Sequence, residues 1–581
     1  MNTQNQIKKY LILLLDTFVI GLIGTICASI FIFLLDLISK FALGYIAGYI
    51  PSDTINIINS HINHPFNSTA LIIVIVTGGL ISGFLVYTFA PEAEGHGTDT
   101  IIRAYHRAGG YLRPIVIPIK IISSAITIGT GGAAGREGPT ALFSAGIGSI
   151  YANIRHASIE KRQLFVIIGM ASGLSAVFKA PMGTAIFSIE VLYSELEYET
   201  RELLFVFFGP LIAYIFSGYL FGWKPIFTLP SNLQITDIKT YIEIILLGII
   251  SGIVSVILPN IFYYTRDLFR KLSIKPHFKP AIGALFVGII GIYIPQVLGG
   301  GYGWIQQAIN GNFTEKIIIL LFIGKILAFS LTVGSGGSGG VFAPSLFIGA
   351  MLGALLSIIF HNTSAIFSVI AMAAVFGAAA RTPLASIVIV IEMAGGYSLL
   401  PATILAVFFS SITHKLICSV FNVKYISLYE AQLLNKNYSI FYQIKTLKNI
   451  LFCYQDLLQL NPSEIEKEEI VELLESGAPI KLPNNKYLFF GKINKNAELK
   501  KEGYIKKFKD LRVLYIFRNG EWYHPSEMEC LKENDEVLVY GAQSALNKLS
   551  SYFTPVSEYF SKLKRQHEKL EEDINKPIPI K

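Results

Sequence analysis

Cysteine is scarce in this 581-residue sequence, and charged residues are few. The four cysteines, Cys27, Cys418, Cys453 and Cys530, are far apart and form no CxxC pair, which argues against a disulfide framework and against a zinc site. Charged residues make up 15% of the chain and hydrophobic residues 52%, whereas soluble domains contain about 25% charged residues and about 45–50% apolar ones. We therefore expect no metal, cofactor or redox chemistry, and a chain too apolar for a soluble globular protein.

Sequence signatures of several enzyme and channel classes are missing as well. No GxxxxGK[ST] phosphate loop, HExxH metalloprotease helix or TVGYG potassium filter occurs. A membrane-embedded enzyme, with His96 and His106 near serine and aspartate residues, is the alternative of another class, and no motif supports it. We therefore predict that the protein is not an enzyme.

Long apolar segments recur through most of the chain. A helix needs roughly 20 apolar residues to cross a bilayer, and segments of about this length occur at residues 10–35, 69–90, 203–222 and 241–259. The sequence therefore predicts an all-α polytopic membrane protein, located in a cell inner membrane or plasma membrane.

The net charge of +8 lies partly in short basic stretches beside these segments. Lys8 and Lys9 precede the first apolar segment, and basic residues crowd a predicted loop over residues 266–279. Basic flanks of membrane segments tend to stay in the cytoplasm. We therefore expect both chain ends on the cytoplasmic side, and we expect no nucleic-acid partner.

The composition changes after about Tyr429, where long apolar runs give way to short segments rich in lysine and glutamate. We predict a membrane domain over residues 1–433 and a cytoplasmic domain over residues 434–581. Asn519 and Gly520 lie between two strand-like runs and predict a tight hairpin, residues 536–540 predict a further strand, and residues 545–553 a short helix. The stretch 485–555 resembles a TrkA-C (RCK C-terminal) module, which implies a small α/β regulatory domain with an unknown ligand. A generic small α/β appendage is the alternative.

Two segments of the predicted membrane domain resemble each other. Lysines, glycines, prolines and glutamates recur at nearly constant offsets, which chance similarity between glycine-rich helices does not explain. These pairs are Lys120/Lys325, Gly129/Gly334, Pro139/Pro344, Pro181/Pro383 and Glu190/Glu392. The sequence therefore predicts two related halves at roughly residues 69–222 and 280–420, although similarity does not say whether they are inverted. Transporters built from such repeats often bind substrate where the halves meet.

Each half carries a glycine-rich stretch directly before an apolar, helix-like run. The start of such a helix presents unpaired N–H groups and a partial positive charge, which together favour an anion. Ionisable side chains within an apolar zone are costly and are therefore functional candidates. These candidates are Lys120, Arg136, Glu137, Lys179, Glu190, Lys325, Arg381 and Glu392.

Glu137 differs from the lysines and glutamates that occur in both halves, because its repeat partner is Phe342. Residues that recur in both halves suit a structural role at least as well as transport. An ionised carboxylate can occupy an electropositive anion site and leave it on protonation. We therefore predict that Glu137 is a gate that couples proton binding to anion passage.

Four motifs resemble those of the CLC chloride channels and transporters: GREGP at residues 135–139, FKAPMGTAIFSIE at 178–190, GGVFAP at 339–344 and SLYEA at 427–431. The resemblance spans roughly residues 10–433. It implies an inverted-repeat helical bundle, a homodimer with one pore in each subunit, and transport of chloride or a similar small anion across the lipid bilayer. It also implies a gating role for Glu137, an anion held by the N–H groups of Val341 and Phe342, and a pore hydroxyl from Tyr429. The predicted anion-binding residues are His96, Arg136, Glu137, Gly138, Val341, Phe342, Ala343 and Tyr429.

Two departures from the family pattern leave the function partly open. Residues 95–99 read GHGTD where the family usually has GSGIP, so His96 either donates a hydrogen bond to the anion or turns aside. Val191 follows Glu190 where proton-exchanging relatives typically carry a second glutamate, which favours a voltage- or pH-gated chloride channel. A chloride/proton antiporter, with protons as a second partner, is the alternative. Three later glutamates are candidate proton entry points: Glu195, Glu197 and Glu199.

Overall fold

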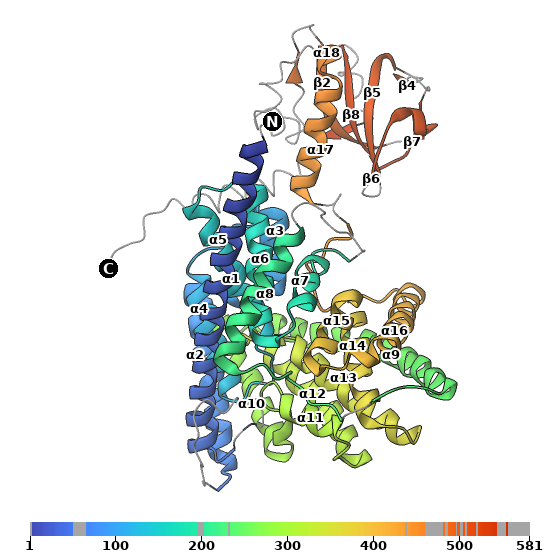
Figure 1. Ribbon diagram of the computed structural model, residues 1–581. Coiled ribbons are helices and arrows are strands. Elements are labelled where there is room, and N and C mark those ends of the chain that lie inside the picture. Colours follow the sequence, from blue (N-terminus) through green and yellow to red (C-terminus); the bar gives the residue numbers. More distant parts are fainter. Residues whose placement is uncertain are drawn as a thin grey trace. The chain divides into compact units, whose positions relative to one another are not determined.

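The computed structural model divides into two compact units, Met1–Leu434 (unit 1) and Asn435–Lys581 (unit 2). Helices make up unit 1, whereas unit 2 contains both helices and strands (Figure 1). The structure describes residues 3–49, 51, 65–194, 203–230, 233–435, 439–458, 480–482, 486–494, 497–499, 504–505, 508–518, 521–542 and 553–555.

Unit 1 confirms the predicted all-α polytopic membrane fold. Among the described residues, nine helices are long and apolar enough to cross a membrane. The α-helices of unit 1 are α1 (Thr3–Ser39), α2 (Ser68–Phe89), α3 (Thr98–Arg107), α4 (Val116–Gly129), α5 (Glu137–Ile154), α6 (Ile159–Phe178), α7 (Pro181–Glu190), α8 (Leu203–Phe221), α9 (Ile238–Lys271), α10 (Lys279–Tyr293), α11 (Tyr302–Ile309), α12 (Glu315–Gly334), α13 (Phe342–Ile359), α14 (Ser364–Ala380), α15 (Pro383–Ala394) and α16 (Leu400–Val420). Shorter elements are the π-helix η1 (Lys40–Ile46) and the 3-10 turns η2 (Pro91–Ala93), η3 (Pro276–Phe278), η4 (Pro295–Val297) and η5 (Tyr397–Leu399).

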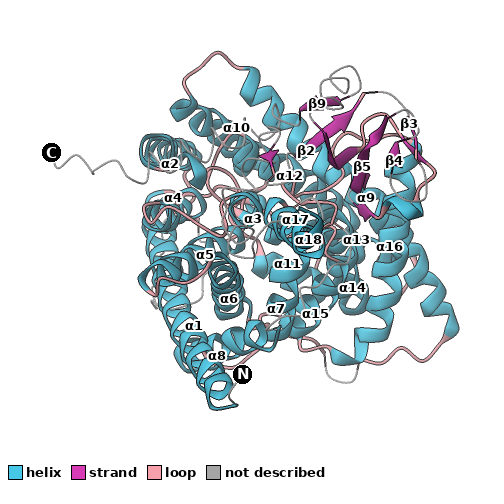
Figure 2. Ribbon diagram, turned by 90° about the horizontal axis from the view of Figure 1, so that it is seen from above, coloured by secondary structure: helices cyan, strands magenta, loops and turns pink. Residues whose placement is uncertain are grey.

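Two closely packed helix pairs, α5 with α6 and α13 with α14, form much of the buried interior (Figure 2). Glycine makes the close approach possible in both pairs. A Cβ on Gly148 of α5 would overlap the carbonyl of Phe165 on α6, and a Cβ on Gly353 of α13 would overlap the carbonyl of Phe367 on α14. The equivalent contacts support the predicted relation between the halves, because matched positions perform the same packing task.

The predicted loop over residues 266–279 is wrong in its first part. Helix α9 continues to Lys271, so Arg266 is helical. Phe262, Tyr263 and Phe269 continue the buried face of α9 past the predicted end of its apolar segment. Arg270 and Lys271 then end the helix, where positive charge suits the negative end of its dipole.

The matched lysines of the two halves make matched hydrogen bonds. Lys120 Nζ donates to the carbonyls of Ala93 (2.9 Å) and Gly95 (2.7 Å). Lys325 Nζ donates to the carbonyls of Val297 (2.9 Å) and Gly299 (2.7 Å). Each fully buried ammonium therefore fixes the turn that precedes a short helix, α3 in one half and α11 in the other. Both lysines have a structural role in the fold.

The matched glutamates cap each other's helices. Glu190, at the end of α7, accepts the N–H groups of Leu384 (3.1 Å) and Ala385 (2.7 Å) at the start of α15. Glu392, near the end of α15, accepts the N–H groups of Met182 (3.2 Å) and Gly183 (2.8 Å) at the start of α7. Each helix end meets the other helix's beginning, so α7 and α15 run antiparallel. This exchange is what an inverted repeat requires.

Lys179 and Arg381 form a further matched pair, at the ends of α6 and α14. Both residues have a positive φ, 55° and 54°, which is uncommon for a residue with a side chain. The turn lets the chain reverse before Pro181 and Pro383, which begin the next helices. The Lys179 ammonium also donates to the carbonyl of Lys224 (3.2 Å) beyond the end of α8. Lys179 and Arg381 are therefore the residues at which α6 and α14 end.

Unit 2 contains the helices α17 (Ile440–Cys453) and α18 (Gln455–Leu458) and a sheet of order β1-β2-β8-β5-β4, whose described strand pairs are antiparallel. The predicted hairpin is confirmed, since Arg518 pairs with Glu521 across Asn519 and Gly520. The predicted strand 536–540 is the central β8 (Glu536–Ala542). Of the predicted helix 545–553, residues 545–552 lie outside the described residues, and Phe553 begins strand β9 (Phe553–Pro555). The remaining strands are β1 (Ile480–Lys481), β2 (Lys486–Ile493), β3 (Ala497–Glu498), β4 (Tyr504–Ile505), β5 (Phe508–Arg518), β6 (Glu521–Tyr523) and β7 (Cys530–Leu531).

We predict that Glu190→Ala destabilises unit 1, because it leaves the N–H groups of Leu384 and Ala385 without their acceptor. An unsatisfied buried polar group costs about 1–3 kcal/mol, so the loss should reach about 2–6 kcal/mol for the two groups together. Glu190→Gln keeps one acceptor oxygen and should lose less. The measurement is the thermal unfolding midpoint in detergent, with Glu315→Ala, an exposed carboxylate on α12, as the control. An alanine variant as stable as the control contradicts the capping role.

Candidate functional site

The helices α5 and α13 begin at the same point in unit 1. Gly135 and Gly340, just before the two helices, exchange two backbone hydrogen bonds: Gly135 N–H to Gly340 O (2.8 Å) and Gly340 N–H to Gly135 O (2.6 Å). The first N–H groups of a helix have no carbonyl partner inside the helix, and its N-terminus carries a partial positive charge. Two such ends therefore create one electropositive region, formed from both halves of the chain.

The turn before α3 joins this region from a third direction. The N–H of Gly339 donates to the carbonyl of Gly95 (3.1 Å). Gly138 leaves space for this arrangement, because a Cβ there would overlap the carbonyl oxygen of His96 and would lie 3.0 Å from the Cα of Gly340. Gly138, predicted as an anion-binding residue, is thus the point of closest approach between the three segments.

Glu137 is the first residue of α5 and is only 2% exposed. Its Oε1 accepts a hydrogen bond from the Tyr302 hydroxyl, and its Oε2 accepts the N–H of Ala343 (3.4 Å). Ala343 lies in the first turn of α13, so the carboxylate occupies the end of the helix where an anion would be most favoured. The predicted gate is therefore held by groups from the second half of the chain.

Arg136 makes a less direct contribution than its neighbour Glu137. Its guanidinium carbon lies 4.7 Å from the centre of the Tyr302 ring, which is a cation–π distance. The arginine thus packs against the tyrosine that binds Glu137.

Val341, Phe342 and Ala343 form the start of α13, and all three are buried. The Phe342 ring packs between Phe178 and Phe376, with centroid distances of 4.6 and 4.4 Å. The aromatic packing fixes the first turn of α13, and the backbone N–H groups at this turn are the donors a helix leaves free.

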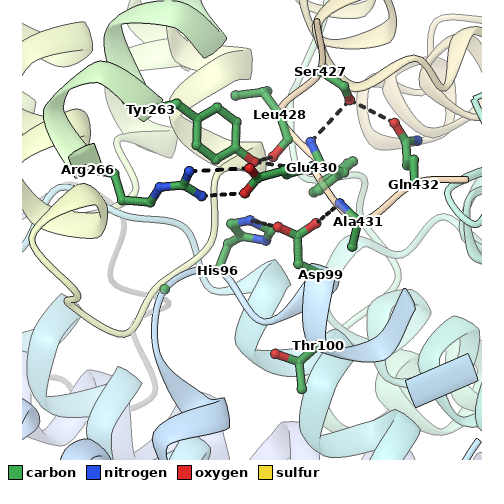
Figure 3. Close-up of polar contacts among 12 residues, drawn as sticks. His96, Asp99, Thr100, Tyr263, Arg266, Ser427, Leu428, Glu430, Ala431 and Gln432 are labelled. Atoms are coloured by element: carbon green, nitrogen blue, oxygen red, sulfur yellow. Dashed lines mark hydrogen bonds and ion pairs between the residues drawn. The ribbon is translucent and has the colours of Figure 1, made fainter. Parts of the chain in front are cut away.

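Tyr429 belongs to the segment 427–432, which several side chains hold in position. Figure 3 shows Ser427, Glu430 and Ala431 of this segment with their partners. The N–H of Tyr429 donates to Ser427 Oγ (3.1 Å), and the N–H of Ala431 donates to Asp99 Oδ1 (3.1 Å). Glu430 forms a hydrogen-bonded ion pair with Arg266, at 2.6 Å for the shorter contact. The Tyr429 ring itself is buried, 5.5 Å from the His96 ring and 6.2 Å from the Phe187 ring.

The His96 ring lies beside the Tyr429 ring and close to the carboxylate of Asp99. Its Nε2 is 3.3 Å from Asp99 Oδ2 (Figure 3). Its Nδ1 is buried and has no hydrogen-bond partner within the described ranges. The structure therefore brings together His96, Gly138, Tyr429 and the first turn of α13. Glu137, the first residue of α5, lies beside them.

Tyr302 and Asp99 were missed by the sequence analysis. Tyr302 had a usable signal, because residues 299–302 (GGGY) follow η4 as residues 95–98 (GHGT) follow η2. Aligning these two stretches would have matched Tyr302 with Thr98, each at the start of a short helix. Asp99 offers no comparable signal, since its role depends on Ala431, far away in the sequence.

The position after Glu190 is occupied by the fully buried Val191. The candidate proton entry points Glu195, Glu197 and Glu199 lie outside the described residues.

Comparisons with known proteins identify relatives of this chain. The sequence matches the Voltage gated chloride channel family over residues 78–415. An "H(+)/Cl(-) exchange transporter ClcA" from Salmonella agona (strain SL483) is 33% identical over 338 residues, covering 55% of this chain and 70% of the relative. The protein of the same name from Salmonella gallinarum (strain 287/91 / NCTC 13346) is 34% identical, with the same coverage of both chains.

Solved structures share the fold of unit 1. A slow cyanobacterial Cl-/H+ antiporter matches with a TM-score of 0.62 at 23% identity, covering 71% of this chain and 96% of that one. A CLC-type fluoride/proton antiporter matches with a TM-score of 0.61 at 22% identity, covering 73% and 98%. The family match over residues 78–415 and the 33% identical relative establish that this chain belongs to the CLC family of voltage gated chloride channels and transporters.

Proposed function

We propose that this protein exchanges chloride for protons across the membrane and that Glu137 is the group for which the two ions compete. The observation that carries the proposal is the position of the Glu137 carboxylate. It lies at the first turn of α13, where it accepts the Tyr302 hydroxyl and the Ala343 N–H. An anion entering the same helix end would need the same donors.

The chemistry of the carboxylate links the two ions. The ionised form is a strong acceptor for N–H and O–H donors and is favoured by a helix N-terminus. The protonated form is neutral and has lost much of this attraction, so it leaves the site and an anion can enter. When the proton dissociates, the carboxylate returns and expels the anion. Because proton and anion alternate at one position, each turnover moves them in opposite directions.

The names of the relatives favour exchange over a channel. The Salmonella relatives are named H(+)/Cl(-) exchange transporters, and proteins of the same fold include two antiporters. The expectation of a channel, which rested on Val191, therefore gives way to its alternative. A chloride channel is the second candidate, because Val191 still lacks the carboxylate that typical exchangers carry at this position.

Chloride is the proposed anion because it is the anion in the names of the Salmonella relatives. A protein of similar fold is titled a fluoride/proton antiporter, and this chain has His96 where the family usually has serine. Fluoride is therefore the competing anion to include in every transport assay.

The first test measures proton movement driven by a chloride gradient in liposomes that contain the purified protein. The wild-type protein should drive protons against their gradient. Glu137→Gln should still pass chloride, lose at least about 90% of the coupled proton movement, and lose most of the pH dependence, because a neutral side chain no longer competes with the anion. Wild-type chloride flux without proton movement contradicts exchange, and a glutamine variant with the wild-type pH profile contradicts the gate.

A second test concerns the hydroxyl that binds the gate. Tyr302→Phe removes the donor to Glu137, and a hydrogen bond to a charged group contributes about 1.5–3 kcal/mol. The ionised carboxylate should be held less firmly, so the variant should retain several-fold more chloride flux than wild type at high pH. The readout is chloride flux across a pH series, with the exposed Tyr293→Phe on α10 as control. A Tyr302→Phe profile identical to that of the control excludes this role.

The proposal extends to the membrane location and the oligomeric state of the protein. The protein is a multi-pass membrane protein, and we propose an inner-membrane location with both termini in the cytoplasm. We also propose a homodimer with one pore in each subunit. Large apolar side chains remain exposed on α16, including Phe408 at 57% and Leu416 at 59%, and a second subunit or lipid must cover them.

Unit 2 is proposed as a regulatory domain, because it has its own hydrophobic clusters, which are separate from the core of unit 1. A chain ending at Asn435 should therefore insert, fold and transport chloride, with altered control by solution conditions. The measurement is chloride flux of the truncated protein after its size in detergent has been checked. A folded truncated protein without flux would assign unit 2 a part in transport itself.

A further inference from the structure

The His96 ring has two nitrogen atoms in different situations. Nε2 lies 3.3 Å from Asp99 Oδ2. Nδ1 is buried and has no hydrogen-bond partner in the part of the chain that the structure describes, and the residue as a whole is 5% exposed. A buried polar atom without a partner costs free energy. A bound ligand would give this Nδ1 the partner that the described residues do not supply.

The position of His96 makes an anion the natural ligand. Its carbonyl oxygen contacts Gly138 in the first turn of α5, and its ring is 5.5 Å from the Tyr429 ring. The same neighbourhood contains the first turn of α13 and so two helix N-termini. This region favours negative charge for reasons that do not depend on His96.

Asp99 determines which hydrogen the imidazole carries. An ionised carboxylate can only accept hydrogen bonds, and Asp99 already accepts the Ala431 N–H through Oδ1 (3.1 Å). Nε2 must therefore carry the hydrogen that faces Asp99. In the neutral ring, Nδ1 then presents a lone pair, which repels an anion. In the protonated ring, Nδ1 presents an N–H, which binds one.

We infer that His96 and Asp99 form a proton-linked anion site, in which a proton and a chloride ion bind together at Nδ1. Binding adds one proton to Nδ1 and one N–H···Cl⁻ hydrogen bond, and release reverses both steps, so no other bond forms or breaks. The inference rests on the proposed function only in taking the anion path to pass Tyr429. His96 would then be a second proton-binding group of the anion path, in addition to Glu137. This chain carries Val191 where proton-exchanging relatives typically have a glutamate.

Other charged or titratable groups surround the pair, and the test must separate them from His96. Histidine is the side chain whose ordinary titration lies between pH 5 and 8. These neighbouring groups are Glu137 on α5, Arg103 on α3, Lys120 on α4 with Glu94 nearby, Tyr429, and Tyr263, Arg266 and Glu430, the last two paired with each other.

Calorimetric chloride titrations of the purified full-length protein at pH 5.5 and 7.5 test the inference. All variants carry Glu137→Gln, so that the gate does not titrate. Because coupling between two ligands is reciprocal, the Glu137→Gln protein should bind chloride roughly five-fold or more tightly at pH 5.5 than at pH 7.5. It should also take up protons on binding, which repeat titrations in buffers of different ionisation enthalpy measure.

Two substitutions change the site in opposite ways. His96→Ser removes the titrating ring and should make chloride binding independent of pH. Asp99→Asn has one carbonyl oxygen, which the Ala431 N–H requires, so its NH₂ group faces Nε2. The neutral ring must then carry its hydrogen on Nδ1. Chloride binding should become pH-independent and, at pH 7.5, tighter than in the Glu137→Gln parent.

His106→Gln is the matched control. His106 is also buried with an unpartnered Nδ1 among the described residues, but its Nε2 contacts the Leu192 carbonyl (3.1 Å) and no carboxylate. This variant should keep the pH dependence of its parent. The inference is overturned if the parent binds chloride equally at both pH values or not at all, or if His96→Ser keeps the pH dependence. Exchange in liposomes is a separate measurement, so either proposal can fail alone.

Discussion

Two positive helix ends face each other at the Gly135–Gly340 pair, and the rest of unit 1 keeps them there. Like partial charges repel, so this arrangement needs negative charge between the ends. In the structure the Glu137 carboxylate supplies it, with Tyr302 and the Ala343 N–H as donors. Because the site favours a negative group and already contains a carboxylate, we propose that an anion and a proton compete there.

Four charged side chains of the surrounding fold are paired with backbone groups. Buried ionic groups are costly unless hydrogen bonds replace their water. Lys120 and Lys325 each donate to two backbone carbonyls, and Glu190 and Glu392 each accept two backbone N–H groups. These four residues fix the turns and helix ends on which the site depends. His96 is different, since only one of its nitrogens has a partner.

Local patterns in the sequence predicted much of this structure. Apolar runs predicted the membrane helices, and the internal offsets predicted two halves and showed that Glu137 has an apolar repeat partner, Phe342. The similarity between the two halves did not predict their inversion, which followed only from the family resemblance, because the inverted arrangement depends on Glu190 meeting Leu384 and Ala385 across the repeat. Tyr302 and Asp99 escaped for the same reason: each acts on a residue of another segment. The end of α9 was misjudged because its buried aromatic face continues among basic residues, where composition suggested a loop.

We propose that Glu137 occupies a position that an anion takes when the carboxylate is neutral. The most direct measurement is the crystal structure of Glu137→Gln grown in bromide, compared with wild type under the same conditions by anomalous scattering. We expect a bromide ion within hydrogen-bonding distance of the Ala343 N–H in the variant and none at that position in the wild-type protein. A variant that binds bromide elsewhere along the path but leaves the first turn of α13 empty would contradict the account.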